Sequence, residues 1–430
     1  MVMELSAPPT TARRLLPEPD GESETLDAYR NGGGYDPATW RRAPADLLAT
    51  IEASGLRGRG GAAYPTGAKW RAVAARPGPR AVLVNAAESE PASRKDRALL
   101  LARPHLVLEG ALLAARAVGA DECVIYAHDP AIARAAERAL RELARAGMPL
   151  PRWRTVVAPP GYVAGEASAA VNFVNGRAAK PAAKPPRPHE RGIGGRPTLV
   201  QNVETLANVP LIAREGAAWF RSAGSPDLPG TILVTLSGAV RRPGVYEVPS
   251  GAPLADVLDG CCGGTPEGVQ AILPGGYFAG WLDPAALREG VALAPASLRA
   301  AGSDLGSAAI TVVPETVCGL WQAARLLRFF ADQSARQCGP CTFGTAAMAE
   351  CLERVAHGRP EPDDLARLRR YAERMLPGRG ACGHLDGATA AARTALAVFA
   401  EEVDTHLRHG GCGRPAASIL PGLEDEHGHD

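Results

Sequence analysis

Apolar and polar residues follow two different periods along the first half of the chain. Short runs rich in apolar residues, over 81–85, 123–127 and 154–157, predict buried strands, whereas apolar residues at helical spacing over 105–118 and 131–146 predict helices. Strands that alternate with helices are typical of a mainly parallel sheet covered by helices, so we expect an α/β, Rossmann-like domain. In such sheets ligands bind beyond the carboxyl ends of the strands.

The second half of the chain has a different pattern. A segment at 176–197, crowded with Lys, Arg, Pro and Gly, predicts a wrapping loop, and a helix over 200–214 follows it. Short strands and one helix come next and predict a small β-grasp domain, of the soluble-ligand-binding type, with elements at 231–237, 245–248, 253–259 and 269–273. Four helices then predict a C-terminal four-helix bundle, with elements at 317–331, 342–356, 362–375 and 387–406.

These patterns divide the chain into five segments. Residues 1–35, rich in Pro, Gly and charge, predict a loose N-terminal arm. We expect a cofactor-binding α/β domain at 36–228, the β-grasp domain at 229–314, a helical domain at 315–408 and a C-terminal tail at 409–430.

Composition excludes several classes of protein. The 430 residues are 46% hydrophobic, enough for a sizeable core, and 47 basic side chains nearly cancel 46 acidic ones. No global field therefore favours nucleic acid or an anionic membrane. No segment reaches the roughly 18 apolar residues of a membrane span, and the first residues lack the apolar core of a signal peptide, so we expect a cytoplasmic protein without direct membrane insertion. Nine scattered cysteines are not a secreted disulfide framework.

The most informative segment is a glycine-rich loop at 55–70, which follows a short helix beginning at Leu47. Glycine lets backbone N–H groups approach an anion, Lys69 supplies a positive charge and Tyr64 offers a ring for stacking, so the loop suits a flat, phosphate-bearing cofactor. The glycines concerned are Gly58, Gly60 and Gly61. The spacing is neither that of a dinucleotide fold nor that of a P-loop, because Ala68 precedes the lysine. A tight turn without a ligand is the alternative.

Three further polar segments could complete such a site. Residues 85–91, at the end of a predicted strand, carry an amide and two carboxylates that suit a flavin edge or nucleotide hydroxyls. Residues 161–169 and 201–206 each place polar groups at the start of a predicted helix, where the helix dipole favours negative charge. The residues concerned are Asn85, Glu88, Glu90, Tyr162, Gly165, Glu166, Asn202 and Thr205. A solvated turn and ordinary helix caps are the alternatives.

Three cysteines form a candidate metal site. Cys338 and Cys341 make a C-x-x-C pair, and Cys382 follows the next predicted helix. Three thiolates hold an iron-sulfur cluster when a fourth ligand comes from elsewhere, and Cys412 and His384 are the candidates. Zinc in a site of three cysteines and one histidine, a redox-active pair and an unmetallated helix turn are the alternatives. The other cysteines are interpreted as small buried hydrophobic residues, at positions 123, 261, 262, 318 and 351.

Taken in order, these segments resemble the flavin-bearing, NADH-binding F-type subunit of respiratory complex I and its relatives in NAD-linked soluble hydrogenases and formate dehydrogenases. The resemblance covers residues 32–403. Four positions depart from the family. Ala87 stands where the family usually has Asp, Ala167 where it has Glu, Gln201 where it has Asn, and Ala335 where it has the first cluster cysteine. We therefore interpret the chain as a divergent paralogue.

The resemblance implies an FMN-dependent NAD(P)H dehydrogenase subunit, with 36–228 as its FMN- and NADH-binding domain and 315–408 as its iron-sulfur domain. Hydride would pass from NAD(H) to FMN, and single electrons would leave through a cluster of the 4Fe-4S type to a ferredoxin-like or other redox subunit. By the same resemblance, Tyr64 and Glu90 help to seat the dinucleotide, the remaining loop residues named above bind FMN, and the three cysteines ligate the cluster. No residue acts as a catalytic acid or base, because positioning directs hydride transfer.

Two other functions are compatible with the sequence. A non-enzymatic scaffold or electron-relay subunit that has lost NADH oxidation would explain the missing acids and the missing cysteine. A flavoprotein with another reductant, such as reduced ferredoxin, would keep the flavin. The sequence leaves open the electron acceptor, the choice between NADH and NADPH, the fourth cluster ligand, the oligomeric state and a peripheral place on a membrane complex.

Overall fold

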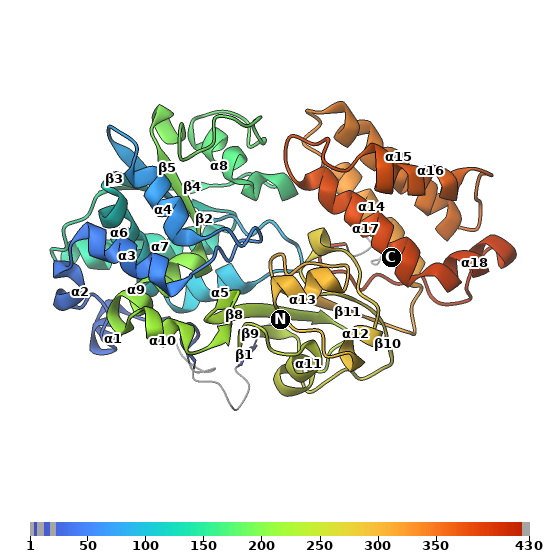
Figure 1. The fold of residues 1–430 in the computed structure, drawn as a ribbon, viewed down its shortest axis with the longest axis horizontal. Coiled ribbons are helices and arrows are strands. Elements are labelled where there is room, and N and C mark those ends of the chain that lie inside the picture. Colours follow the sequence, from blue (N-terminus) through green and yellow to red (C-terminus); the bar gives the residue numbers. More distant parts are fainter. Residues whose placement is uncertain (1–3, 7–12, 18–22, 424–430) are drawn as a thin grey trace. The chain divides into compact units, whose positions relative to one another are not determined.

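The computed structural model describes residues 4–6, 13–17 and 23–423. Figure 1 shows them as a ribbon coloured along the sequence. They form two compact units that each mix helices and strands, so the α/β class predicted from the sequence is confirmed. The first unit contains Met1–Ser89, Arg94–Leu233 and Val245–Gly251, and the second contains Glu90–Ser93, Val234–Gly244 and Ala252–Asp430.

The first unit is built on a four-stranded parallel sheet. The strand order is β4-β3-β2-β5, with β2 at Arg80–Ala86, β3 at Ala120–Ala127, β4 at Arg152–Val157 and β5 at Thr198–Asn202. In the register of this sheet Asn85 of β2 lies opposite Asn202 of β5. Two side chains that the sequence assigns to the cofactor site therefore end neighbouring strands at the same edge.

Helices cover both faces of this sheet. Alternate residues of β2 point to opposite sides, so Val82 joins the larger core cluster and Leu83 joins the smaller one. A Cβ on Gly110 would lie 1.9 Å from the carbonyl oxygen of Leu206, so glycine is needed where α6 meets α9. The larger cluster takes residues from α3 (Pro44–Ser54), α4 (Thr66–Ala74), α6 (Pro104–Val118), α7 (Pro130–Arg145) and α9 (Val203–Glu215), and the smaller one from α8 (Ala167–Val174).

One predicted helix begins later than expected. Residues 200–202, predicted as the start of a helix, belong to β5, and α9 begins at Val203. The apolar side chains of residues 199 and 200 are buried in a strand that pairs with β2. Asn202 ends that strand and caps the helix, because its side chain accepts hydrogen bonds from the backbone N–H groups of Glu204 and Thr205.

The sequence predicts a loose arm over residues 1–35, and this prediction is wrong for the described ranges 13–17 and 23–35. Residues 1–3, 7–12 and 18–22 lie outside the description. The side chains of Leu15 and Leu16 are buried in the larger core cluster, and the carboxylate of Glu247 accepts their backbone N–H groups at 2.9 and 3.1 Å. A second buried carboxylate, Glu109, accepts the hydroxyl of Tyr29 at 2.5 Å. The apolar and polar contacts together hold this segment on the first unit.

The first unit also contains shorter elements. They are β1 (Glu4–Ser6), α1 (Leu26–Asn31), α2 (Pro37–Arg41), α5 (Lys95–Ala102), α10 (Ala217–Arg221), β6 (Gly224–Ser225), β7 (Leu228–Pro229) and most of β9 (Gly244–Pro249). Two 3-10 helices are also present, η1 at Tyr162–Gly165 before α8 and η2 at Ile193–Gly195 within the predicted wrapping loop.

In the second unit, strand β11 (Ala309–Pro314) pairs in parallel with the end of β8 (Thr231–Gly238) and antiparallel with β10 (Val269–Leu273). The sequence analysis missed β11, although its run of buried apolar residues is a strand signal. Short helices join these strands, at α11 (Leu254–Cys262), η3 (Tyr277–Ala279), α12 (Ala285–Arg288) and α13 (Pro295–Ala300).

The C-terminal helices of the second unit pack together, α14 against α15 and α17, and α15 against α16. A single helix was predicted over 387–406, but the helix breaks at Phe399, whose ring is buried and lies 5.2 Å from that of Trp281. The predicted helix over 362–375 changes to a π-helix at Tyr371. The bounds are α14 (Gly319–Asp332), α15 (Gly339–Ala356), α16 (Asp364–Arg370), η4 (Tyr371–Met375), α17 (His384–Val398) and α18 (Ala400–His409).

Within the described residues, no single helix is long and apolar enough to cross a membrane. Helices α5 and α6 reach the required length and composition only as a pair that is bent by 98°.

Candidate functional site

The glycine-rich loop joins α3 to α4 in the first unit. Its ends are held together, since the backbone N–H of Gly58 donates to the carbonyl of Tyr64 at 2.9 Å. Gly61 has a φ of +107°, which disfavours any residue with a Cβ. A Cβ on Gly60 would lie 3.1 Å from the Cβ of Asn202. The loop therefore brings its backbone close to the start of α9, as a cofactor cradle requires.

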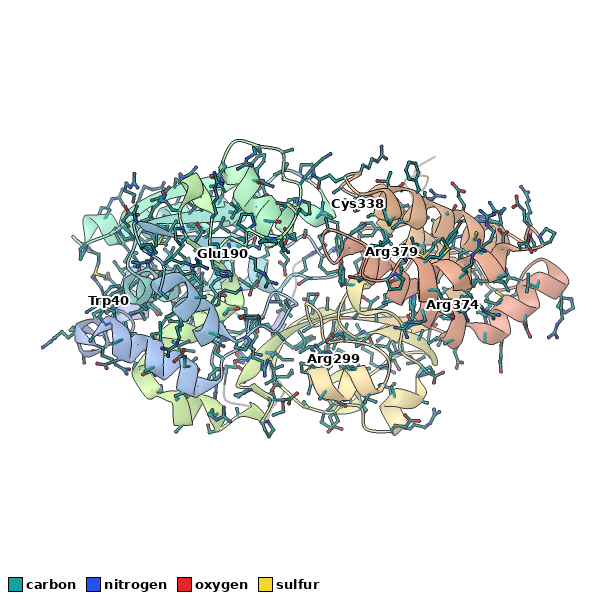
Figure 2. All side chains as sticks on the ribbon, turned by 45° about the horizontal axis from the view of Figure 1, so that its top comes forward. Trp40, Glu190, Arg299, Cys338, Arg374 and Arg379 are labelled. Carbon is teal, nitrogen blue, oxygen red and sulfur yellow. The ribbon has the colours of Figure 1, made fainter. Side chains whose placement is uncertain are left out.

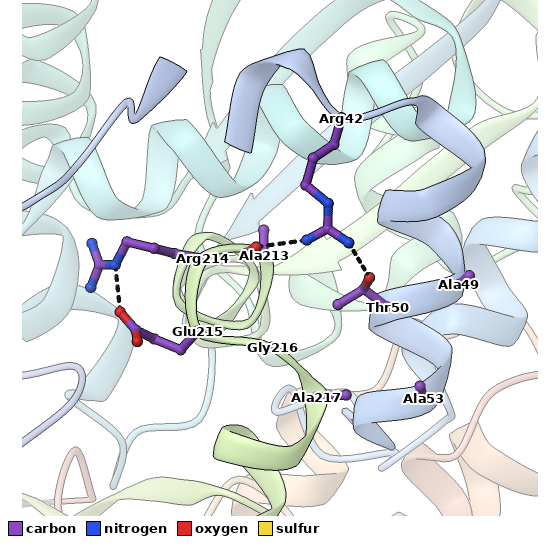
Figure 3. A pocket seen from close by; sticks show the side chains of 9 residues that line it. All are labelled: Arg42, Ala49, Thr50, Ala53, Ala213, Arg214, Glu215, Gly216 and Ala217. Atoms are coloured by element: carbon purple, nitrogen blue, oxygen red, sulfur yellow. Dashed lines mark hydrogen bonds and ion pairs between the residues drawn. The ribbon is translucent and has the colours of Figure 1, made fainter. Parts of the chain in front are cut away.

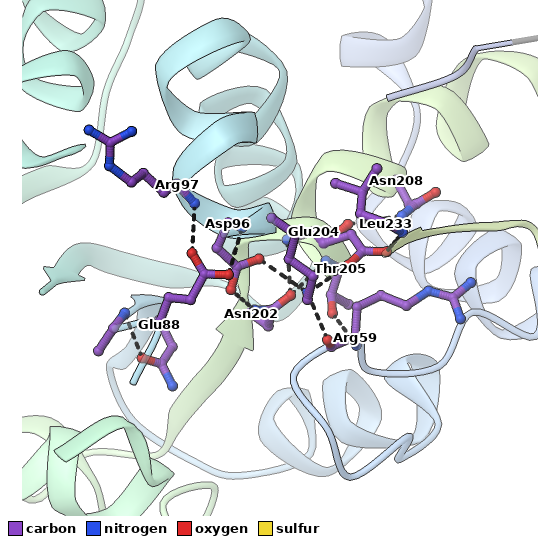
Figure 4. A network of polar contacts seen from close by, with 12 residues as sticks. Arg59, Glu88, Asp96, Arg97, Asn202, Glu204, Thr205, Asn208 and Leu233 are labelled. Atoms are coloured by element: carbon purple, nitrogen blue, oxygen red, sulfur yellow. Dashed lines mark hydrogen bonds and ion pairs between the residues drawn. The ribbon is translucent and has the colours of Figure 1, made fainter. Parts of the chain in front are cut away.

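Polar side chains of the motif at 201–206 hold this loop in place (Figure 4). The hydroxyl of Thr205 accepts the backbone N–H of Arg59 at 2.8 Å. The side-chain carbonyl of Asn202 caps α9, and its amide donates to Asp96 at 2.5 Å. Both side chains, predicted to bind a flavin phosphate, thus have structural partners that any ligand contact would have to share.

A buried ion pair that the sequence analysis missed lies behind the loop. The ammonium of Lys95 lies 2.6 Å from the carboxylate of Glu204 and 3.3 Å from that of Asp96. It also donates to the carbonyl of Arg59 at 2.9 Å. Burial lowers the pKa of Lys95, but the two carboxylates raise it by more, so the amine stays charged. Before the structure was known, the only sign of this ion pair in the sequence was that two of the motifs contain charged residues.

Lys69 of α4 is the best-placed cation for an anionic ligand. Its ammonium makes one hydrogen bond to a described residue, to the carbonyl of Val200 at 3.3 Å, although it carries three donors. Burial lowers the pKa of Lys69. Its nitrogen lies 6.0 Å from the ring centre of Tyr64, which is 49% exposed and free to stack. A partly buried ammonium with donors to spare, beside an exposed ring, fits a phosphate-bearing, aromatic cofactor.

A second unsatisfied donor lies on the strand next to Val200. The amide nitrogen of Gln201 is buried and has no hydrogen-bond partner among the described residues. Since neighbouring strand residues point to opposite faces and Val200 joins the smaller core, Gln201 points to the face that carries α4. Lys69 and Gln201 therefore both offer donors that a cofactor would satisfy, and the residues present fit FMN.

The turn at 161–166 is anchored to the end of β2. The side-chain amide of Asn85 donates to the carbonyl of Gly165 at 2.9 Å. A Cβ on Gly165 would lie 2.7 Å from the carbonyl oxygen of Ala87, so only glycine fits this approach. Tyr162 begins the short 3-10 helix that Gly165 ends. Glu166 caps α8 through the N–H of residue 168 at 2.7 Å. The structure thus brings this turn to Asn85 at the carboxyl edge of the sheet.

The two glutamates of the segment at 85–91 have different surroundings. Glu88 caps α5, because its carboxylate accepts the backbone N–H groups of Asp96 at 3.1 Å and Arg97 at 3.0 Å. Glu90 belongs to the second unit, where it accepts the backbone N–H of Tyr277 at 3.1 Å. Both carboxylates have structural roles in addition to the ligand contacts that the sequence predicts for them.

The three predicted cluster cysteines lie in the second unit, where the thiols of Cys338 and Cys382 act electrostatically on that of Cys341, although the three are not among the described groups whose ligand atoms all lie within 4.8 Å. Figure 2 labels Cys338. Cys338 precedes α15, Cys341 lies in its first turn and Cys382 lies just before α17. Burial raises the pKa of Cys341 to about 11, the hydroxyl of Ser334 at 3.2 Å opposes this, and the nearby thiols of Cys338 and Cys382 raise it further. A cation that holds all three as thiolates would relieve this repulsion, so the donor set fits an iron-sulfur cluster.

The two candidates for the fourth cluster ligand, His384 and Cys412, each have another close neighbour. A ring nitrogen of His384 lies 2.7 Å from the carbonyl oxygen of Phe330, which occupies that nitrogen. Cys412 lies instead with Cys318 and His406, within 4.8 Å. Cys318 is buried, as predicted, but it has polar neighbours.

A surface pocket of about 400 Å³ lies elsewhere in the first unit (Figure 3). Arg42 is its most prominent polar side chain, and the guanidinium donates to the carbonyl of Ala213 at 2.7 Å and to the hydroxyl of Thr50 at 2.6 Å. None of the residues predicted from the sequence lines this pocket. Its main cation is already satisfied, so it carries no functional assignment.

Three family models match the chain in order. Residues 51–211 match the Nuo51 FMN-binding domain. Residues 233–276 match the SLBB domain. Residues 321–406 match the NADH-ubiquinone oxidoreductase-F iron-sulfur binding region.

Whole-length relatives show the same family. The chain is 36% identical to the second F-type subunit of the NADH-quinone oxidoreductases of Rhizobium meliloti, over 93% of this chain and 98% of that protein. It is 37% identical to the NADH-quinone oxidoreductase F-type subunit of Streptomyces coelicolor, over 91% and 90%. Among solved structures, a chain of an NAD+-reducing [NiFe]-hydrogenase in the H2-reduced state superposes with a TM-score of 0.80 at 31% identity, over 93% of this chain and 69% of that one.

Proposed function

Because the chain belongs to the family of NADH-quinone oxidoreductase F-type subunits, we propose that it is the electron-input subunit of a larger oxidoreductase, where NAD(P)H is oxidised. FMN and an iron-sulfur cluster are its cofactors, in keeping with the two matched domains. The observation that carries the proposal is the partly buried ammonium of Lys69 beside the glycine-rich loop, because its hydrogen bond to the carbonyl of Val200 leaves donors that a phosphate would take. FMN, when bound, supplies a two-electron acceptor that releases electrons one at a time.

The residues that hold FMN in this proposal act as binding groups. Backbone N–H groups of the glycine-rich loop and the ammonium of Lys69 bind the phosphate, and the turn at 161–166 with Asn85 borders the ring. Asn202 and Thr205 contribute by fixing the loop on α9. The full set is Gly58, Gly60, Gly61, Lys69, Asn85, Glu88, Tyr162, Gly165, Glu166, Asn202 and Thr205.

Tyr64 and Glu90 seat the dinucleotide in this proposal. The exposed ring of Tyr64 offers a stacking surface for adenine or nicotinamide. No side chain transfers a proton, because the site directs hydride by position alone. The missing acids at Ala87 and Ala167 leave the site less negative than in the resembled family, which favours tighter binding of the phosphates of NAD(P)H.

We assign Cys338, Cys341 and Cys382 as ligands of a 4Fe-4S cluster with one further ligand. The cluster would carry single electrons from the flavin domain to a redox partner, for which a ferredoxin-like protein is the proposed type. The finer architecture belongs to the same proposal: an FMN- and NADH-binding domain at 36–228, a β-grasp domain at 229–314, a four-helix iron-sulfur domain at 315–408 and a cytoplasmic location, peripheral to any membrane complex.

The test is an anaerobic visible spectrum of the purified full-length protein before and after NADH, then NADPH, with iron measured on the same sample. Bleaching of a flavin band by either nucleotide supports the electron-input function, and the more effective nucleotide identifies the donor. If dithionite bleaches the bound flavin but neither nucleotide does, the alternative-reductant function replaces the electron-input function. Protein that binds no added FMN would replace it with the scaffold function.

A further inference from the structure

A second group of metal-ligating side chains lies in the second unit, outside the predicted cluster. Cys318 is the N-cap of α14, His406 lies in the last turn of α18 and Cys412 follows the end of that helix. Their two sulfur atoms and one imidazole nitrogen all lie within 4.8 Å of one another. Helices α14 and α18, far apart in the chain, therefore meet the C-terminal tail at three donors of metal-binding type.

The spacing matches a single small ion. A tetrahedral zinc ion with bonds of about 2.3 Å to sulfur and about 2.05 Å to nitrogen separates its ligand atoms by about 3.6–3.8 Å. The Nε2 atom of His406 lies 3.4 Å from the sulfur of Cys318. The third donor, Cys412, lies within 4.8 Å of both. Shifts of a few tenths of an ångström for the first pair, and at most about 1 Å for the third donor, would complete such a site.

The surroundings favour an ion at this place. Cys318 is 2% exposed and His406 is 4% exposed, so both donors are shielded from solvent. The sulfur of Cys318 accepts the backbone N–H of Trp321 at 3.3 Å, an interaction that stabilises a thiolate. Two thiolates and one divalent cation sum to zero charge, so the buried site holds no net charge when filled.

The types of ligand atom at this site indicate which metal ion would bind. Two sulfurs and one imidazole suit zinc and exclude magnesium and calcium, which prefer oxygen ligands. The carboxylate of Glu402, which acts electrostatically on Cys318, already accepts the backbone N–H of Leu320 at 2.8 Å and a guanidinium N–H of Arg414 at 2.6 Å. Three protein donors leave one position of a tetrahedral zinc ion for a water molecule.

The tail already follows the path that such a site would fix. The backbone N–H of Cys318 donates to the carbonyl of Pro415 at 3.0 Å. The side-chain amide of Gln322 donates to the carbonyl of Ala417 at 2.6 Å. An ion at the three donors would tie the start of α14, the end of α18 and this tail into one unit.

We propose that Cys318, His406 and Cys412 form a zinc site that fastens the C-terminal tail to the helices of the second unit. The site is separate from the iron-sulfur cysteines and stands whether or not the proposed function is right. A disulfide between the two cysteines is the competing arrangement, and it differs because it does not need His406.

The experiment measures zinc and iron per chain in the full-length protein after incubation with ZnCl2 and removal of free metal. We expect about one zinc per chain in the wild type, and a loss of zinc affinity of about tenfold or more in His406→Gln and in Cys412→Ser. Iron content should not change in either variant. His409→Gln, on the same helix but outside the group, is the matched control. Cys412→Ser keeps the test valid if His406→Gln does not fold.

Cobalt provides a second readout. Cobalt-loaded wild type should show thiolate-to-metal charge-transfer absorption that Cys412→Ser lacks and His409→Gln keeps. Wild type that binds no zinc, or zinc that survives both ligand variants, would overturn the proposal. A Cys318–Cys412 disulfide found by mass spectrometry in wild type and His406→Gln alike would overturn it in favour of the disulfide.

Discussion

The ammonium of Lys95 lies 2.6 Å from a carboxylate oxygen of Glu204, and both side chains are almost fully buried. The same ammonium donates to the carbonyl of Arg59 in the glycine-rich loop at 2.9 Å. The second carboxylate oxygen of Glu204 accepts the backbone N–H of Leu233 at 3.0 Å. One ion pair therefore joins α5, α9, the loop and the start of β8, and it sets the shape of the cofactor cradle.

Removing one member of this pair should destabilise the protein. Glu204→Gln keeps the shape of the side chain but leaves the buried ammonium with Asp96 alone. We expect the free energy of unfolding, measured by urea denaturation, to fall by about 3 kcal/mol, as for other broken buried ion pairs. Glu52→Gln, which breaks an exposed pair with Arg71, is the control and should change little. Equal losses of unfolding free energy in the two variants would show that the buried pair contributes no more to stability than the exposed pair.

Lys69→Met should reduce flavin content. Methionine keeps the buried apolar stem and removes the charge, so we expect flavin affinity to fall by about tenfold or more, the loss of a charge-assisted hydrogen bond. Bound flavin per chain, measured by absorbance after gel filtration, checks this. Lys180→Met, at an exposed position of the first unit, is the control. Equal flavin occupancy in Lys69→Met and wild type would rule out the loop lysine as the phosphate ligand.

The same residue predicts a pH dependence of stability in the flavin-free protein. Burial lowers the pKa of Lys69 below its usual 10.5, so the folded chain releases this proton at a lower pH than the unfolded chain. Between the two pKa values the unfolded state binds more protons, and stability must rise with pH. We expect Lys69→Met to be more stable than wild type near neutral pH, by a margin that shrinks as the pH rises to 10.5. Urea denaturation across this range tests it, and a constant margin would contradict the burial argument.

Cys338→Ser should remove iron from the protein. The substitution takes away one of three thiolates, and a serine hydroxyl is a much poorer ligand for an iron-sulfur cluster. Iron and acid-labile sulfide per chain, measured after anaerobic purification, check this. Cys351→Ser, which changes a buried cysteine in α15, the helix that Cys338 precedes, is the matched control and should keep its iron. Unchanged iron in Cys338→Ser would mean that the C-x-x-C pair does not bind the cluster.

Ala335→Cys should strengthen the cluster. The neighbouring residue, Ser334, lies 3.2 Å from the thiol of Cys341, so a cysteine at position 335 starts close to that thiol. We expect iron to be lost more slowly to a chelator than from wild type, because a fourth thiolate replaces a weaker ligand. Ala331→Cys, at the end of α14, is a control with a cysteine in a different place. Equal rates in the three proteins would show that position 335 is out of reach.

Several elements could be predicted from local pattern alone. The strands at 81–85 and 123–127 and the helices at 105–118 and 131–146 differ from the observed bounds by a few residues, because their periodicity reports burial directly. Two errors share one cause. The strand at β5 and the break at Phe399 depend on partners distant in the chain, which local propensity does not register.

The sequence by itself determined the α/β class and, through five motifs in order, the family to which the chain belongs. Motifs are local, so they identify which residue types occur but not what each side chain contacts. Only the tertiary structure decided that Asn202 and Thr205 hold the loop, that Lys95 pairs with Glu204 and that Cys412 lies with Cys318 and His406. Each of these groups includes residues far apart in the chain, and folding of the whole unit is what brings their atoms close together.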